Sequence, residues 1–198
     1  MPRWGDRPQG ARFRGRLIVL SGPSGAGKST IAEALLRRRP DLVTVTSRTT
    51  RPPRPGDGKG KSYEHVSREA FERHRADGGF LESAEVHGDL YGTPKDEVER
   101  ALAVGRNVLL EIDPQGARQV KGLIPGAITI FVDPPDWETL EARLRARGTE
   151  DEARMARRLA SARQELADAG DFDHRVVNDQ LEQAVEQVNR ILEQVIST

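Results

Sequence analysis

Eight residues near the start of the chain, 22–29, read G-P-S-G-A-G-K-S and match the phosphate-loop pattern G-x-x-x-x-G-K-[ST]. Glycines at these positions let the backbone turn tightly and point several N–H groups inward. Lys28 is expected to reach the β- and γ-phosphates of a nucleotide, and the Ser29 hydroxyl to bind Mg²⁺. The pattern therefore predicts an ATP-binding loop made of Gly22, Pro23, Ser24, Gly25, Ala26, Gly27, Lys28, Ser29 and Thr30.

The flanking sequence favours this interpretation over a chance match in a glycine-rich turn. An apolar run at 17–20 precedes the loop, and 30–36 has the composition of a helix. A phosphate loop lies between a strand and a helix, where the partial positive charge of the helix N-terminus attracts an anion.

Two acidic residues, Glu111 and Asp113, follow the apolar run that begins at Asn107. We expect both on one face of a strand, at the carboxyl end where open α/β sheets bind ligands. Beside a phosphate loop, such an acid holds Mg²⁺ directly or through water, so the candidate metal ligands are Ser29, Glu111 and Asp113. Without the loop, a solvated pair at a strand end would be the simpler interpretation.

An arginine-rich segment, S-R-T-T-R-P-P-R at 47–54, is the second candidate anion site. Proline stiffens the segment, so less conformational freedom is lost when an anion binds. The guanidinium groups of Arg51 and Arg54 can each hold a phosphate through two parallel hydrogen bonds. Taken alone, the segment also fits an ordinary basic surface loop.

Short apolar runs alternate with helical patterns, which predicts an α/β fold with three layers: a parallel core sheet flanked by helices. Thr93 is expected to cap a helix that closes at Gly105, and 47–61 to form an exposed loop. Strands are expected at 17–21, 42–46, 80–86, 107–112, 127–132 and 174–177, and helices from 30 to before Pro40, over 68–76, twice within 134–166, and at 181–195.

Composition narrows the class of protein. The chain has 198 residues, a formal net charge of zero and no cysteine. We therefore expect no nucleic-acid partner, no disulfide and no thiolate metal site, in keeping with a cytoplasmic protein. No apolar run is long enough to predict a membrane span, and no obligatory protein partner is implied. Residues 1–15 are expected to be a disordered tail.

Further motifs add a family resemblance to these local patterns. Tyr63 follows the arginine segment, and F-L-E at 80–82, Y-G-T-P at 91–94, E-I-D at 111–113, R-G-T-E at 147–150 and V-V-N-D at 176–179 come in that order. Together with the phosphate loop they are highly specific, and the sequence resembles the guanylate kinase family over about residues 16–196. That family transfers a phosphoryl group from ATP to GMP.

The resemblance implies one domain at 16–198, with a GMP-binding insertion at about 47–95 and a lid at about 134–165. ATP and GMP are the implied partners, and Mg²⁺ is the implied cofactor. Asn178 falls in a segment similar to the one that lines the family's adenine site. The implied GMP-binding residues are Ser47, Arg51, Arg54, Tyr63, Glu82, Tyr91, Gly92, Thr93 and Asp113. The implied catalytic residues are Lys28, Arg51, Arg143, Arg147 and Arg158.

The sequence departs from the family pattern at Ser83, where a tryptophan is frequent, and at Glu64-His65, where an aromatic pair is usual. These departures put GMP affinity in question rather than the reaction. Two other functions remain open at this point: a related phosphate-loop kinase that acts on a sugar phosphate, and a guanylate-kinase-like binding module without catalysis.

Overall fold

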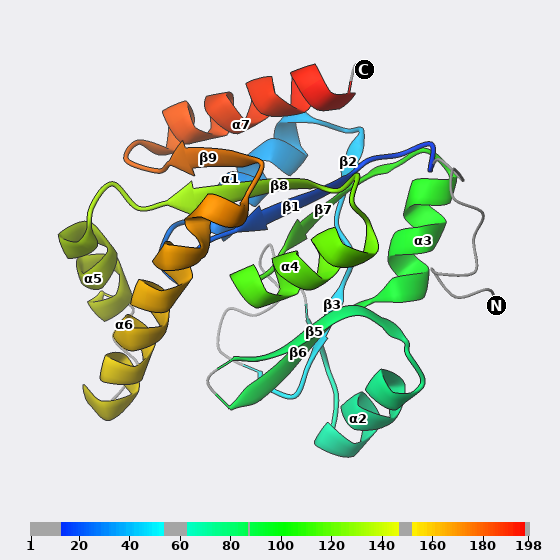
Figure 1. Ribbon diagram of the computed structural model, residues 1–198, viewed down its shortest axis with the longest axis horizontal. Coiled ribbons are helices and arrows are strands. Elements are labelled where there is room, and N and C mark those ends of the chain that lie inside the picture. The colour runs from blue at the N-terminus through cyan, green and yellow to red at the C-terminus, as the bar shows by residue number, and fades with distance from the viewer. Residues whose placement is uncertain (1–12, 54–62, 87, 147–151, 197–198) are drawn as a thin grey trace.

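The computed structural model of the protein describes residues 13–53, 63–86, 88–146 and 152–196 (Figure 1). Its core is a five-stranded parallel sheet in the order β2-β7-β1-β8-β9, which confirms the predicted α/β fold. The strands are β1 (Leu17–Ser21), β2 (Leu42–Val43), β7 (Asn107–Glu111), β8 (Ile128–Asp133) and β9 (His174–Val177). The central strand β1 lies between β7 and β8.

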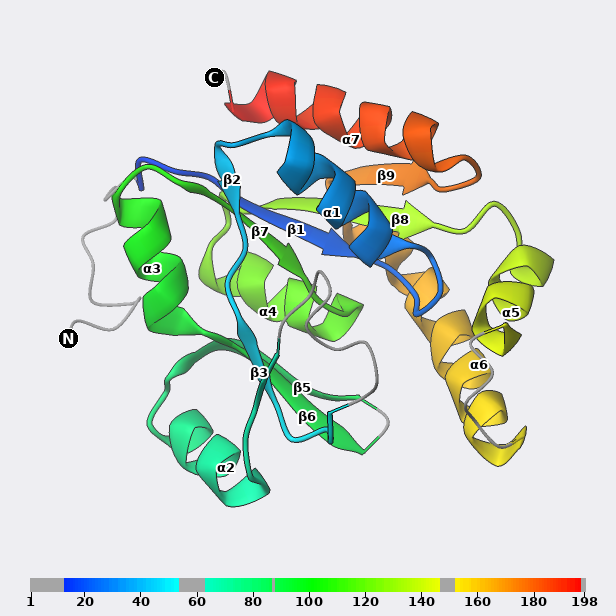
Figure 2. The ribbon, with the colours of Figure 1, turned by 180° about the vertical axis from the view of Figure 1, so that it is seen from behind.

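Helices cover both faces of this sheet because β1 is apolar on both sides. Ile18 and Leu20 face the cluster formed with α1 (Lys28–Arg38) and α7 (Leu181–Ile196), and the alternate residues Leu17 and Val19 face the other cluster. That second cluster includes residues of α3 (Lys95–Ala103) and α4 (Pro114–Leu123). Figures 1 and 2 show the two helical layers from opposite sides.

A smaller sheet, in the order β4-β3-β6-β5, forms below the core. It contains β3 (Ser47–Thr49), β4 (Tyr63–His65), β5 (Phe80–Val86) and β6 (Asp89–Pro94), with α2 (Arg68–Ala76) between β4 and β5 in the chain. Strand β6 pairs antiparallel with β3 and β5. Gly92 has no room for a side chain there, since a Cβ would lie 2.8 Å from the ring of Phe80 and 3.0 Å from that of Phe71.

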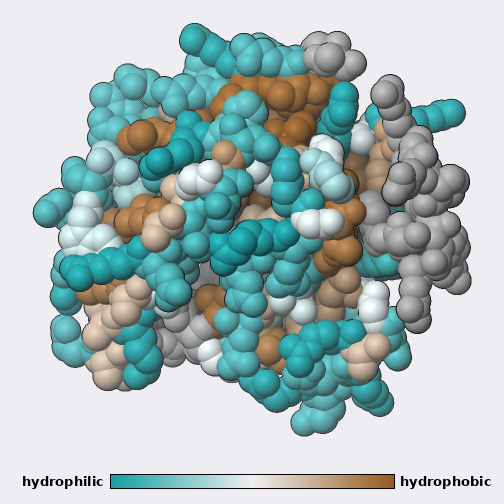
Figure 3. All heavy atoms as spheres, in the orientation of Figure 1, coloured by the Kyte–Doolittle hydropathy of each residue, from teal (hydrophilic) through white to brown (hydrophobic). Residues whose placement is uncertain are grey.

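A helical arm of α5 (Trp137–Arg145) and α6 (Glu152–Ala167) extends beside the core sheet, followed by a short 3₁₀ helix (Asp168–Asp171). Leu140, Leu144, Met155 and Ala162 form its own apolar cluster. Figure 3 shows the face seen in Figure 1, where hydrophilic residues predominate and apolar atoms appear in separate patches, one of them just below α7. Within the described ranges, no helix is long and apolar enough to cross a membrane.

Several predicted elements are confirmed, and others were wrong. The strands at 17–21, 80–86 and 174–177 and the helix at 68–76 have the predicted bounds. The strand predicted at 42–46 ends at Val43, and Ser47–Thr49, predicted as loop, is strand β3. Helix α4 and strands β4 and β6 were missed.

Thr93 is not a helix cap, which corrects another prediction. It lies in β6, and its hydroxyl donates to the carboxylate of Glu82, so the cap position of α3 falls to Pro94, which makes no side-chain cap bond. Asp113 does not share a strand face with Glu111 either, because β7 ends at Glu111 and Asp113 caps α4.

The end of the predicted tail belongs to the packed structure. Phe13 packs against the core cluster of α3 and α4, and the backbone N–H of Gly15 donates to the carbonyl of Leu102 at 3.1 Å. Residues 1–12 lie outside the described part of the chain. Residues 13–15 therefore pack with the rest of the described chain.

The packing around Gly15 gives a stability prediction. A Cβ at Gly15 would lie 1.9 Å from the backbone oxygen of Arg106, which no rotamer change can relieve, so Gly15→Ala is expected to lower the free energy of unfolding by about 2–4 kcal/mol. The control is Gly122→Ala, because nothing lies within 4 Å of a Cβ there and alanine favours the helix by about 0.5 kcal/mol. Urea unfolding of both variants tests the pair, and equal midpoints would contradict the prediction.

Candidate active site

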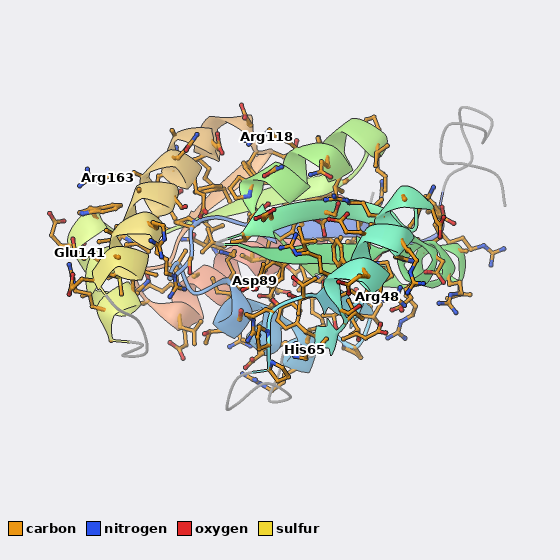
Figure 4. All side chains as sticks on the ribbon, turned by 90° about the horizontal axis from the view of Figure 1, so that it is seen from below. Arg48, His65, Asp89, Arg118, Glu141 and Arg163 are labelled. Carbon is orange, nitrogen blue, oxygen red and sulfur yellow. The ribbon has the colours of Figure 1, made fainter. Side chains whose placement is uncertain are left out.

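A cleft of about 310 Å³ lies where the phosphate loop, the small sheet and α6 meet. Figure 4 shows this region from below: Glu141 and Arg163 mark the arm, Arg48 and His65 mark the small sheet, and Asp89 lies between them in this view. The lining includes Ser24 and Lys28 from the loop, Tyr91 from β6 and Glu165 from α6. Two regions that the sequence predicted separately therefore share one cavity.

The phosphate loop is held in shape by its glycines and from behind by Asn178. Gly25 and Gly27 have φ values of 92° and 91°, in the left-handed region that favours glycine. The Asn178 amide donates to the carbonyl of Ala26 at 2.7 Å, and a Cβ at Gly27 would lie 2.2 Å from that amide nitrogen. Lys28 donates to the loop carbonyls of Gly22 and Pro23, at 2.5 and 2.9 Å.

Oxygen ligands suited to Mg²⁺ meet at the end of the loop. The Ser29 hydroxyl donates to Glu111 Oε2 at 2.7 Å, because β7 runs parallel to β1 and ends beside the loop. Asp113 lines the same cavity, and its Oδ1 accepts from the N–H of Gly116 at 2.7 Å. Among the described residues no three acidic or histidine side chains form a metal cage. Mg²⁺ needs none, since it usually takes one or two side chains with phosphate and water.

The opposite wall presents hydrogen-bond donors for an anion. Arg51 is 7% exposed, and its guanidinium lies 5.7 Å from the ring centre of Tyr63. The rings of Tyr63 and Tyr91 meet edge to face with centres 5.8 Å apart. Burial raises the pKa of the Tyr91 phenol, which keeps its proton available for donation. This is a suitable site for a phosphate dianion.

A buried carboxylate, that of Glu82, lies beside this anion site. Glu82 is 5% exposed, and its Oε1 accepts from the hydroxyl of Thr93 at 2.5 Å. Ser47, on β3, also lines the cavity. A carboxylate acceptor in the same cavity as the phosphate donors suits the N–H groups of a base.

Helix α6 brings a cation and an acid to the loop. Arg158 is 8% exposed and donates to Ser24 Oγ at 2.9 Å. Glu165, which the sequence analysis missed, lines the cavity two turns later in the same helix. Burial is the main cause that raises its pKa to about 6, opposed by the charge of Lys28. No sequence motif identifies this glutamate, because its place in the cavity results from how α6 packs near the phosphate loop in the folded chain.

The predicted residues therefore fall into three groups. Those that line the cavity are Gly22, Ser24, Gly25, Gly27, Lys28, Ser29, Thr30, Ser47, Arg51, Tyr63, Glu82, Tyr91, Gly92, Glu111, Asp113 and Arg158. Pro23, Ala26, Thr93, Arg143 and Asn178 lie outside its lining, and Arg143 donates to the carbonyl of Asn178 at 3.1 and 3.2 Å. Arg54 and Arg147 lie outside the described residues.

A phosphate loop after the central strand of a parallel sheet, facing an anion site on an inserted sheet, defines a phosphate-loop kinase. The family model described as guanylate kinase matches residues 14–195. Guanylate kinases of Gloeobacter violaceus and Rubrobacter xylanophilus are 52% and 50% identical to this chain. The alignments cover 89% and 93% of this chain and 86% and 96% of those proteins.

The structural comparison agrees with the sequence comparison. The crystal structure of guanylate kinase from Anaplasma phagocytophilum superimposes with a TM-score of 0.76 at 33% sequence identity, covering 92% of this chain and 87% of that one. The chain belongs to the guanylate kinase family.

Glu165 gives a prediction for stability against pH. Its folded pKa of about 6 exceeds the ordinary value of 4.5, so the folded state binds the proton more tightly and loses stability as pH rises between these values. The difference corresponds to roughly 2 kcal/mol. Glu165→Gln should therefore raise the free energy of unfolding at pH 7.5 and change it little at pH 4.5.

Chemical denaturation of both proteins at the two pH values measures this difference. The control is Glu138→Gln, which makes the same change at an exposed position of α5 and should shift neither value by more than about 0.5 kcal/mol. An equal effect of Glu165→Gln at both pH values would contradict the raised pKa.

Proposed function

We propose that this protein transfers the γ-phosphoryl group of ATP to GMP, giving ADP and GDP. The observation that carries the proposal is the single cleft that joins an intact phosphate loop to an anion site and a buried carboxylate. Membership of the guanylate kinase family supports the same reaction.

The phosphate loop binds the phosphates of ATP. Its inward N–H groups and Lys28 neutralise charge on the β- and γ-phosphates, while Asn178 supports the loop from behind. For this, Lys28 must exchange its bonds to the loop carbonyls for phosphate oxygens. Ser29, Glu111 and Asp113 would hold Mg²⁺, directly or through water, and the ion would offset phosphate charge when bound.

The small sheet binds GMP. Arg51, Tyr63 and Tyr91 donate to its phosphate, and Arg54 is proposed to join them. Glu82 reads guanine, which offers two adjacent donors, the ring N1–H and the exocyclic amino group. Ser47 and Thr93 complete the base site, with the Thr93 hydroxyl orienting the carboxylate.

Catalysis then rests on alignment and charge. The GMP phosphate is already an anionic nucleophile, so no general base is required, and Arg51 holds it in line with the γ-phosphoryl group. Arg158 lies at the loop and stabilises charge on the transferring group. Arg143 and Arg147 are proposed to join it when the arm, about 134–165, closes as a lid and excludes water.

A kinase for sugar phosphates is the second candidate for the same phosphate chemistry. A sugar-phosphate kinase has no use for a buried carboxylate at the base position. The two candidate functions are therefore distinguished by which substrate accepts the phosphoryl group. A non-catalytic module would not need Lys28 or the glycines of the loop, and all are intact here.

The deciding experiment measures ADP release with GMP, AMP, UMP and ribose 5-phosphate as acceptors. Adenine has a bare acceptor at N1 that the Glu82 carboxylate repels, so kcat/KM for AMP should be lower by about 10⁴. Glu82→Gln should lower kcat/KM for GMP by a factor that corresponds to roughly 2–4 kcal/mol, whereas kcat/KM for AMP should not fall, because the amide can donate to adenine N1.

The matched control is Glu85→Gln, which changes an exposed glutamate on the same strand. Glu85→Gln should leave kcat/KM unchanged for both GMP and AMP. A GMP-to-AMP ratio that Glu82→Gln does not alter would show that Glu82 does not read the base, and turnover with ribose 5-phosphate alone would reject the reaction.

Lys28 gives a separate test of the ATP site. Lys28→Met removes the cation that offsets charge on the β- and γ-oxygens, so kcat should fall by about 10²–10³-fold. Lys121→Met is the control, because Lys121 pairs with Asp173 and lies outside the cleft lining. A folded Lys28 variant with near-normal turnover would contradict the assignment.

A further inference from the structure

A glutamine on α4 holds the backbone of the strand that carries Glu82. The Oε1 atom of Gln119 accepts from the N–H of Ser83 at 3.2 Å, and its Nε2 donates to the carbonyl of Ser83 at 3.0 Å. A carboxamide offers one acceptor and a donor in a plane, as a residue of a neighbouring strand does. Gln119 thus occupies the place of a strand partner at one residue of β5.

The position of β5 in its sheet explains why a partner is needed. It is an edge strand, which within the described residues pairs only with β6, and Ser83 is opposite Gly92 in that pairing. The backbone groups of an edge strand that point away from the sheet need water or another partner. Here the helix supplies both bonds at a partly buried position, and so joins the small sheet to the core.

The contact between Gln119 and Ser83 is one residue from the buried carboxylate of the cleft. Helix α4 touches Glu82 itself, since a Cβ at Gly116 would lie 2.7 Å from Glu82 Oε2. The same helix is capped by Asp113, which also lines the cleft. One rigid element therefore contacts both the strand that carries the base-site carboxylate and the candidate metal site.

We infer that Gln119 is a positioning residue for base selection, which acts by fixing β5 against α4 so that the Glu82 carboxylate faces the base. The inference rests on the proposed function. Hydrogen bonds to two donors of guanine require a carboxylate held in one plane, and small displacements of a positioned group weaken such contacts strongly. The cleft reaches Glu82 but does not include Gln119 in its lining, so Gln119 acts through the strand.

The test replaces the carboxamide by a side chain of similar length that cannot hydrogen-bond. Gln119→Met should raise KM for GMP by about tenfold and lower the GMP-to-AMP ratio of kcat/KM, because β5 loses two bonds near Glu82. KM for ATP should change less than about twofold, since the loop contacts are untouched. If Gln119 had a merely structural role, Gln119→Met would lower the melting temperature without raising KM for GMP more than KM for ATP.

Two controls accompany it. Gln187→Met makes the same change at an exposed position of α7 and should alter nothing. Ser83→Ala removes a side chain but keeps the backbone groups that Gln119 binds, so KM for GMP should stay within about twofold. Gln119→Glu keeps the acceptor for the Ser83 N–H and loses the donor, so it should give an intermediate KM and replaces the methionine variant if that one does not fold.

Amide hydrogen exchange at Ser83 supplies a readout that is independent of catalysis. Exchange at Ser83 should be faster in Gln119→Met than in the wild type, with the amides of β1 unchanged. Unchanged exchange, or faster exchange with an unaltered KM for GMP and an unaltered GMP-to-AMP ratio, would overturn the inference. A wild-type protein that does not phosphorylate GMP would reject the proposed function instead, whatever the exchange result.

Discussion

The parallel pairing of β1 with β7 and β8 is the constraint on which the rest of the structure depends. It brings the carboxyl ends of these strands to one edge of the sheet, so the phosphate loop after Ser21 emerges beside Glu111. Leu20 is in register with Glu111. The phosphate loop that follows β1 brings the Ser29 hydroxyl oxygen to 2.7 Å from Glu111 Oε2. Phosphate and metal chemistry thus meet at one edge because of backbone hydrogen bonding in the sheet.

Burial on both faces keeps this ladder in register. Every residue of β1 is buried, with alternate side chains in two separate clusters, so a shift of one residue would exchange their surroundings. The register of β1 also fixes the position of the phosphate loop, since the loop is joined to β1 at one end and to α1 at the other. Asn178 adds a contact from β9's side of the sheet through the carbonyl of Ala26.

The parts predicted correctly from sequence are those in which local pattern and function coincide. The loop motif carries its own conformation in Gly25 and Gly27, and the apolar run 17–20 directly before it is short enough to favour a buried strand. Thr93 was misread because a threonine before proline and acidic residues also fits a helix start. Its hydroxyl instead bonds Glu82, eleven residues away on a paired strand.

The remaining features depend on contacts between segments far apart in the chain. Nothing local distinguishes Glu165 from Glu152, the other acid of α6, and its raised pKa comes from burial against a loop more than a hundred residues earlier. Helix α4 was missed because two glycines, Gly116 and Gly122, weaken its intrinsic propensity. It forms because Asp113 caps it and because Ala117 and Val120 fill the core below it.

Arg158 and Glu165 stand on one helix, about 10 Å apart along its axis, and both meet the phosphate loop. Because both residues stand on the same sixteen-residue helix, one element sets the position of both backbones relative to the loop. Any tilt of the arm therefore moves a cation and an anion together.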